Sequence, residues 1–290
     1  MENKKTSFRS ITLLRTSVNT FLGHSTILYP LLLIAFIQLL TLELLYFYPR
    51  FPLNVFFGPI VRRLWSEGYL HYPFNFALLP QLFYYAQLLI YIFIGAFLSA
   101  VAIEIIAAVN NEKRTSFKTA VRKTLPAYVH IFILSILSLS AVFGLSQAYG
   151  LLIQRALKLR AETGILSIIK KTILYGAPYA DLLLGVIVTT ALAFTIPIIV
   201  IERKKIFAAL ILNFRMLLRS LFFVFTIVLL PTLLYVPILL LRSNFMATVS
   251  QNMPIFQFIV LMLSVLVTIF IDATVLTATT TFYLHKKEDK

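Results

Sequence analysis

The phrase Lys5-Thr6-Ser7-Phe8-Arg9-Ser10 recurs as Arg114-Thr115-Ser116-Phe117-Lys118-Thr119, each time ahead of a long apolar run. A looser third copy, Arg203-Lys204-Lys205-Ile206-Phe207-Ala208, precedes another such run. Each copy opens a basic segment in which apolar and charged residues are spaced as on opposite faces of a helix. The chain is therefore predicted to contain three copies of one unit, a short basic amphipathic helix followed by a pair of transmembrane helices.

Composition places the chain among membrane proteins. Of its 290 residues, 60% are hydrophobic and 13% are charged, whereas soluble domains average about 45–50% and roughly 25%. The absence of cysteine excludes disulfides, thiolate catalysis and Cys-ligated metals. The net charge of +15 is typical of loops beside anionic headgroups. Nucleic-acid binding is not expected, because no soluble basic domain with a recognition motif is present.

Six apolar runs are long enough to cross a bilayer, which takes about 20 helical residues. The prediction is a single all-α membrane domain over residues 1–290, a polytopic helical bundle with repeat units at about 1–109, 110–201 and 202–290. The predicted spans are residues 27–48, 82–109, 127–154, 181–201, 221–241 and 255–283.

The distribution of Lys and Arg predicts the orientation. With the N-terminus inside, the inner segments hold 17 of these residues and the outer loops hold 9. Basic residues accumulate on the cytoplasmic side, so both termini are predicted to be cytoplasmic, in a cell inner membrane. The segment from Arg155 to Lys171 runs against this rule, because it places five basic residues outside.

The basic segments supply the candidate headgroup contacts. Lys118 and Arg122 lie four residues apart, as do Arg215 and Arg219, so each pair occupies one helical face. Such helices lie in the headgroup plane and bind anionic lipids. The alternative is that these segments are ordinary basic linkers that only help to set the topology.

Polar residues inside the spans supply a second candidate site, because they are costly to bury in lipid. Asp272 shares a face of the sixth span with Ser264, Thr268 and Thr279. Glu104 lies near the inner end of the second span. The functional interpretation is a proton, ion or headgroup site. The alternative is helix–helix hydrogen bonding for the stripe and an interfacial anchor for Glu104.

No catalytic signature accompanies these residues. The chain lacks a Walker sequence, a G-x-S-x-G elbow and a His-Glu-x-x-His motif, and its four histidines are scattered. We therefore expect no enzymatic activity, no metal site and no cofactor.

One stretch resembles a known family. Pro197, then Glu202 five residues later, then Ala209 and Leu210, resemble the membrane domain that occurs alone or fused to bacterial glycerophosphodiester phosphodiesterases, and YciC-like six-span proteins. Asn213 stands where that pattern has Ser, and the phosphodiesterase domain is absent. The resemblance covers about twenty residues. It implies an integral membrane protein linked to lipid or envelope upkeep, and it transfers no catalytic site.

Two functions remain open. The first is a non-enzymatic scaffold, an accessory subunit of a membrane complex or a lipid-handling protein, whose partners are membrane lipids and other membrane subunits. The alternative is a transporter or permease component in which Asp272 and Glu104 line the path.

Overall fold

A computed structural model describes residues 10–158, 164–248 and 254–288, and within them the chain is helical with no strand. Six helices are long and apolar enough to cross a membrane, which confirms the predicted six-span bundle. Their bounds differ from the predicted ones mainly at the ends. They are Ser25–Tyr46, Phe74–Asn110, Phe117–Lys158, Tyr179–Ile201, Leu221–Arg242 and Ile255–Lys287.

Several spans are built from more than one helix. Only the first and the last are each a single helix, α2 (Ser25–Tyr46) and α13 (Pro254–Glu288). The second span consists of α4 (Phe74–Ile90), the π-helical segment η2 (Tyr91–Gly95) and α5 (Ala96–Asn110), and the third consists of α6 (Phe117–Thr124), η3 (Leu125–Ala127) and α7 (Tyr128–Lys158). The fourth span consists of α8 (Ile165–Ala191) and α9 (Thr195–Ile201). The fifth consists of α11 (Leu221–Thr232), η4 (Leu233–Tyr235) and α12 (Val236–Thr248).

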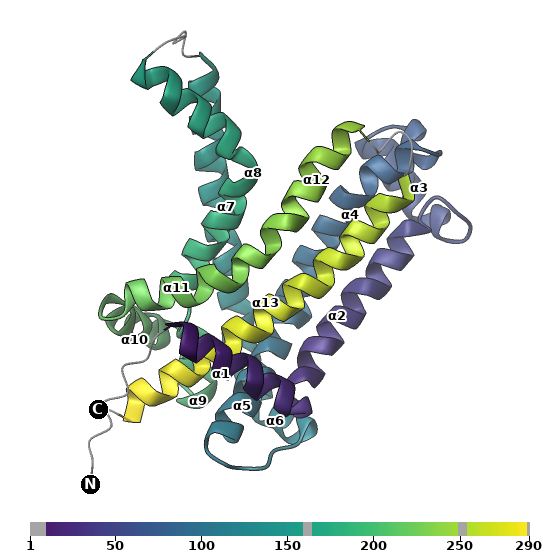
Figure 1. Ribbon diagram of the computed structural model, residues 1–290. Helices are drawn as coiled ribbons and strands as arrows, with labels where there is room; N and C mark the ends of the chain where they lie inside the picture. Colours follow the sequence, from purple (N-terminus) through teal and green to yellow (C-terminus); the bar gives the residue numbers. More distant parts are fainter. Residues whose placement is uncertain (1–9, 159–163, 249–253, 289–290) are drawn as a thin grey trace.

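The connecting helices define two sides of the bundle. The start of α1 and the end of α13 lie on one side, together with α6, α9 and α10 (Ile206–Leu218), as Figure 1 shows. We call this the terminal side. The opposite, or far, side carries α3 (Leu53–Leu64) and the short helix η1 (Glu67–Leu70).

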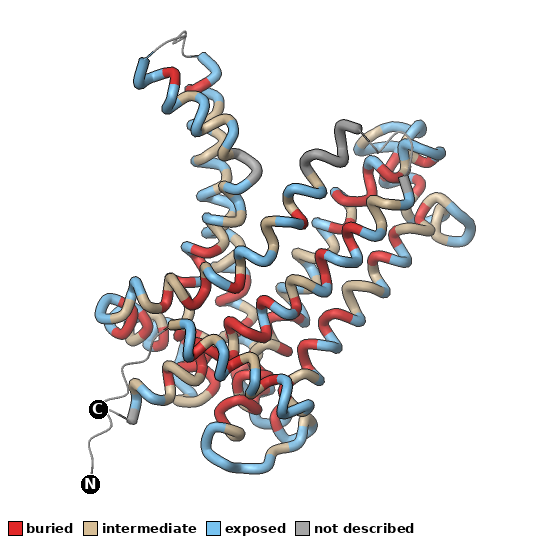
Figure 2. Tube along the Cα trace, in the orientation of Figure 1, coloured by how far each residue is buried: buried red, intermediate tan, exposed pale blue. Residues whose placement is uncertain are grey.

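Two hydrophobic cores meet along α5 and α13. The first joins α1 (Ser10–Gly23), α2, α4, α5 and α13, and the second joins α5, α7, α9, α10, α11 and α13. Buried positions concentrate toward the terminal side, whereas the hairpin of α7 and α8 is largely exposed (Figure 2). The two sets of helices are therefore held together mainly near the chain termini.

A short helix comes before the long helix of the first, third and fifth spans: α1 before α2, α6 before α7, and α10 before α11. In the second copy of the repeated phrase, the Ser116 side chain accepts a hydrogen bond from the Thr119 amide and caps α6, as Ser does at many helix starts. In the first copy, Lys5 to Arg9 lie outside the described residues. The three-unit repeat itself stays a prediction.

The predicted headgroup contacts Lys118, Arg122, Arg215 and Arg219 are all exposed on α6 and α10 or at their ends. Not every short helix lies free on the surface, however. On α1, Leu13, Ser17 and Phe21 are buried, and the rings of Phe21 and Phe270 meet edge to face at 5.7 Å. Since Phe270 belongs to α13, α1 packs on the last span.

The connection between the third and fourth spans contains more helix than the predicted span at residues 181–201. From Ile165 onward it forms one continuous helix, α8, that runs to Ala191. Hydrogen bonds to α7 hold this length together: the Tyr149 hydroxyl donates to the Ile173 carbonyl at 2.7 Å, and Ser146 donates to Asp181 at 2.7 Å. The helix that pairs with α7 therefore starts well before residue 181, where the fourth span is predicted to begin.

Candidate intramembrane binding site

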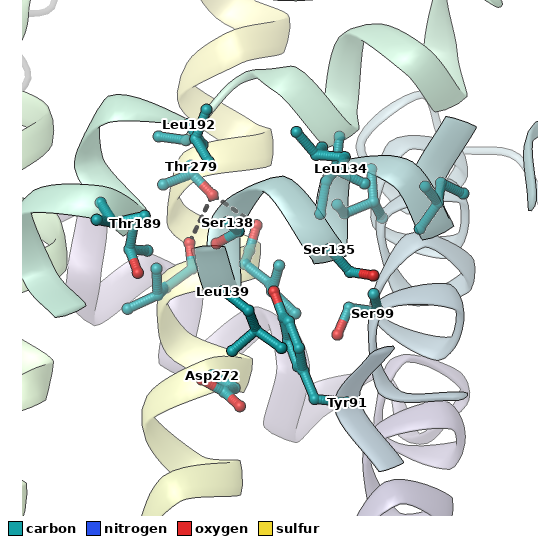
Figure 3. A pocket seen from close by; sticks show the side chains of 18 of the residues that line it. Tyr91, Ser99, Leu134, Ser135, Ser138, Leu139, Thr189, Leu192, Asp272 and Thr279 are labelled. Atoms are coloured by element: carbon teal, nitrogen blue, oxygen red, sulfur yellow. Dashed lines mark hydrogen bonds between the residues drawn. The ribbon is translucent and has the colours of Figure 1, made fainter. Parts of the chain in front are cut away.

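A cavity of about 330 Å³ lies between the two sets of spans. Its walls come from η2, α5, α7, α8, α9 and α13, and they are mostly aliphatic. The polar residues on the walls are Tyr91, Ser99, Ser135, Ser138, Thr189, Asp272 and Thr279. Figure 3 shows these side chains arranged around the cavity. Its volume is at the lower end of the range for small-molecule sites, about 300–1,000 Å³.

Asp272 is the one acidic residue among those lining the cavity. It lies halfway along the Ile255–Lys287 span, and it is exposed toward the cavity. Within the described part of the chain, no hydrogen bond or ion pair engages its carboxyl group. Across the cavity stands Tyr91, whose hydroxyl is in hydrogen-bonding reach of Ser138 (Figure 3). The site therefore offers an unpaired carboxyl group beside two hydroxyls.

The π-helical segment η2 places Tyr91 on the cavity wall. A wider turn changes the helical register and leaves carbonyl groups without their usual partners. Side chains of α7 contact two of these groups: Tyr128 donates to the Phe93 carbonyl at 3.1 Å, and the Ser135 hydroxyl, which donates to the Phe132 carbonyl at 2.8 Å, also lies 3.4 Å from the Ile92 carbonyl. The irregular turn is thus fixed by its neighbour and not left strained.

A break in the fourth span forms another part of the wall. The chain leaves α8 at Leu192 and resumes as α9 at Thr195, because Pro197 cannot donate the next helical hydrogen bond. Asn213 on α10 fills the gap: its side chain accepts from the Phe194 amide at 3.0 Å and donates to the Ala191 carbonyl at 2.7 Å. The fully buried Asn213 therefore holds the break open beside the cavity.

The predicted polar stripe on α13 divides in the structure. Thr279 lines the cavity together with Asp272, and its hydroxyl donates to the carbonyls of Val275 and Leu276 on its own helix (dashed in Figure 3). Ser264 is buried against its own helix and donates to the Leu261 carbonyl. Thr268 is half-buried, and neither it nor Ser264 is among the lining residues.

Glu104 lies outside the cavity, although its neighbour Ile103 lines it. The Glu104 carboxylate is 3.3 Å from the Lys123 ammonium and 3.7 Å from the Arg203 guanidinium. Arg203 also donates a hydrogen bond to the Lys123 carbonyl. The structure therefore does not bring Glu104 and Asp272 to one path; Glu104 ties α5 to α6 and to the turn after α9.

A second cluster surrounds Glu202, which directly precedes Arg203 in the chain. The Tyr283 hydroxyl donates to its carboxylate, and the ammonium groups of Lys204 and Lys287 lie 2.9 and 3.9 Å away. Burial alone would raise the pKa of Glu202, but the hydrogen bonds from Tyr283 and Lys204 and the two positive charges outweigh it and lower the pKa. Glu202 is thus an ionised carboxylate that ties α9 to α13.

We refer to these two groups together as the terminal-side clamp: Glu104, Lys123, Glu202, Arg203, Lys204, Tyr283 and Lys287. On each of three helices, residues of this clamp follow shortly after residues that line the cavity. Glu104 follows Ile103, Tyr283 lies one turn after Thr279, and Glu202 lies five residues after Pro197. The helices that wall the cavity are thus tied together at their terminal-side ends.

The sequence pointed to Asp272, Thr279 and Glu104 but missed most of their surroundings. The aromatic Tyr91 and the serines of α7 carried no signal, because hydroxyl residues are common at helix–helix contacts in membranes. Asn213 does carry a signal, because it stands where the family pattern has Ser. Among the described residues, no group of three or more His, Asp or Glu is placed to hold a metal ion.

Comparison of the chain with models of known protein families, with curated proteins and with solved structures finds no match.

Proposed function

We propose that the chain is a non-enzymatic multi-pass membrane protein that binds a small cationic solute at Asp272 and acts as a transporter or a permease component. The observation that carries this proposal is the Asp272 carboxyl group, which is exposed to a cavity at mid-span and has no ionic partner among the residues that the structure describes. By insertion scales, a charged Asp at the bilayer centre costs about 2.5–3.5 kcal/mol. A function that uses the charge or the proton of Asp272 would explain why the chain has a residue with this cost at mid-span.

The lining of the cavity supports a cationic solute over an anionic one. No Lys, Arg or His lies among the lining residues, so a bound anion would meet only the Asp272 carboxylate and hydroxyl dipoles. A cation meets the carboxylate, the hydroxyl oxygens and the ring face of Tyr91, which attracts positive charge. The mostly aliphatic walls suit a solute with a small apolar body.

A hydrophobic carbodiimide tests access to the site, because it reacts with carboxylic acids that are reached from an apolar phase. We expect labelling at Asp272 in the wild type, no label at this position in Asp272→Asn, and unchanged labelling in Thr268→Val, which alters a polar residue of the same helix outside the cavity. Mass spectrometry of peptides locates the label. An unlabelled Asp272 in the folded wild type would contradict an open site.

Uptake into proteoliposomes tests transport. Radiolabelled choline and sodium are suitable probes, because both are permanently charged. We expect saturable uptake of one of them by the wild type and by Thr268→Val, and a loss of about ten-fold or more in Asp272→Asn, since the amide keeps the size but not the charge. Equal uptake in Asp272→Asn and the wild type would exclude Asp272 from the transport step.

A second candidate function, the accessory subunit, is favoured by the exposed hairpin of α7 and α8. In an 18-residue apolar stretch of the span Phe117–Lys158, only 17% of the residues are buried within the chain, against 56% in the corresponding stretch of Phe74–Asn110. A subunit partner in the membrane would cover this surface. Purification in mild detergent with protein mass spectrometry tests it: a stoichiometric partner that is lost when Ile133 and Ile136, both exposed on α7, are changed to Trp would support this function.

A further inference from the structure

On the far side, two cavities adjoin along α2 and α13. One, of about 720 Å³, lies beyond the end of α2, and the other, of about 610 Å³, lies along α2 inside its span. They share Tyr46, Ile255 and Ile259 on their walls. They adjoin at these three residues, and we call the two cavities together the far-side groove.

Polar residues gather at one end of the far-side groove. Arg50, His71, Tyr72 and Asn75 line the cavity beyond α2, and they lie in the connection between the first two spans or at the start of α4. The wall beneath them is fixed, because Tyr48 is buried and its hydroxyl donates to the Tyr69 carbonyl at 2.6 Å. Burial raises the pKa of Tyr48 to about 12, so this tie stays protonated over the whole physiological range.

The other end of the groove is apolar and follows the span into the bilayer. Phe36, Leu39, Leu40, Phe258 and Met262 line it, with Glu43 as the single charged residue. The distance along α2 from Phe36 to Tyr46 is about 15 Å at 1.5 Å per residue. That length equals half of a hydrocarbon core of about 30 Å, which is the depth of one leaflet.

Arg50 provides the positive charge at the polar end. Its guanidinium lies over the Phe47 ring at 5.3 Å, and within the described residues no carboxylate pairs with it. A guanidinium presents a planar set of donors that matches the oxygens of a phosphate. Glu43 lies about two turns deeper, where a second anionic group would be repelled. Because Arg50 provides one positive charge and the carboxylate of Glu43 lies deeper, the groove suits a headgroup with a single phosphate.

We propose that the far-side groove binds one phospholipid, with its phosphate at Arg50 and one acyl chain along Phe36, Leu40 and Met262. The proposal is independent of the Asp272 cavity, which lies on other helix faces and contains none of these residues. His71 and Tyr72 stand beside the phosphate position and can donate further hydrogen bonds. A phospholipid fits because the groove is polar at one end and apolar at the other, is as long as one leaflet is deep, and carries the positive charge of Arg50 at its polar end.

The full-length protein, delipidated in detergent, tests the proposal by its thermal stabilisation on titration with a one-phosphate phospholipid. We expect saturable stabilisation of the wild type and about ten-fold weaker binding in Arg50→Gln, because a hydrogen bond to a charged group contributes about that factor. Arg63→Gln is the matched control: it removes the same charge from the same side, and Arg63 is exposed outside the groove.

The apolar end is tested separately. Leu40→Trp fills the groove and should abolish the stabilisation, whereas Leu32→Trp, at an exposed position of the same helix outside the groove, should leave it unchanged. Equal binding by Arg50→Gln and Arg63→Gln would overturn the proposal. It would also fail if inorganic phosphate alone gave the full stabilisation, or if diacylglycerol, which lacks phosphate, bound as tightly as the phospholipid.

Discussion

Glu202 and Arg203 are neighbours in the chain, yet their side chains join different helices. Glu202 meets Tyr283 and Lys287 of α13, and Arg203 meets Glu104 of α5. Arg203 adopts a φ of 57°, the left-handed conformation that commonly ends a helix and that Gly adopts most readily. Arg203 thus combines a backbone conformation that Gly adopts more readily with an ion pair to Glu104.

The lowered pKa of Glu202 makes the terminal-side clamp sensitive to acid. A carboxylate whose pKa in the folded protein is below its ordinary value of 4.5 stabilises the fold above that value. This stabilisation is lost as the pH falls through the lower, folded-state pKa. We therefore expect Glu202→Gln to lower the Tm at pH 7, where a hydrogen bond to a charged group contributes about 1.5–3 kcal/mol.

Each kcal/mol moves the Tm by roughly 2–4 °C in a chain of this size, so thermal unfolding in detergent resolves the difference. The gap between wild type and Glu202→Gln should narrow as the pH falls below about 4.5, the ordinary pKa of the group, and through its lower pKa in the folded protein. Glu67→Gln removes a carboxylate from the exposed pair with Arg62 and should change the Tm little. A gap that does not narrow at any pH below 4.5 would contradict the lowered pKa of Glu202.

The break between α8 and α9 shows how one helix can stabilise an irregularity in another. Pro197 explains why the span is interrupted, but Asn213 of α10 explains why the interruption is tolerated, since its amide satisfies one donor and one acceptor there. Isolated backbone groups inside a membrane cost several kcal/mol. The side chain therefore pairs two backbone groups in the turn between α8 and α9 that have lost their helical partners.

Asn213→Ala should destabilise the protein by about 2–6 kcal/mol, because it leaves the Phe194 amide and the Ala191 carbonyl unpaired at about 1–3 kcal/mol each. Because these groups border the cavity, carbodiimide labelling of Asp272 should also change. Asn19→Ala, at an exposed position of α1, is the control and should have little effect. A Tm of Asn213→Ala within one degree of the wild type would refute the bridging role.

The spans could be predicted because the bilayer imposes a minimum length on every apolar run, and this requirement is visible in the sequence alone. The π-helical turn at Tyr91–Gly95, the bridge from Asn213 and the pairing of Glu104 with Arg203 could not. Each depends on a neighbour far along the chain. The sequence likewise pointed to Asp272 by its polarity, but the cavity around it is assembled from six separate segments.

The arrangement of the whole molecule makes the topology testable. Six spans place the start of α1 and the end of α13 on one side, as seen in Figure 1, and the Lys/Arg distribution predicts that this side is cytoplasmic. Reporter fusions after Asn111 and after Lys204 should report the cytoplasm, and a fusion after Glu67 the opposite side. A cytoplasmic signal from the Glu67 fusion would invert the orientation.

The contact between the first and last helices has a consequence for biosynthesis. Phe21, Ile27 and Leu31 share a core with Val265 and Ile269, so the N-terminal helices complete their packing only when α13 has been translated. At about 5–20 residues per second, the intervening chain of roughly 250 residues takes about 10–50 s to synthesise. During that interval α1 and α2 wait in the membrane for their partner, and a ribosome that stalls before α13 leaves them exposed to quality-control proteases.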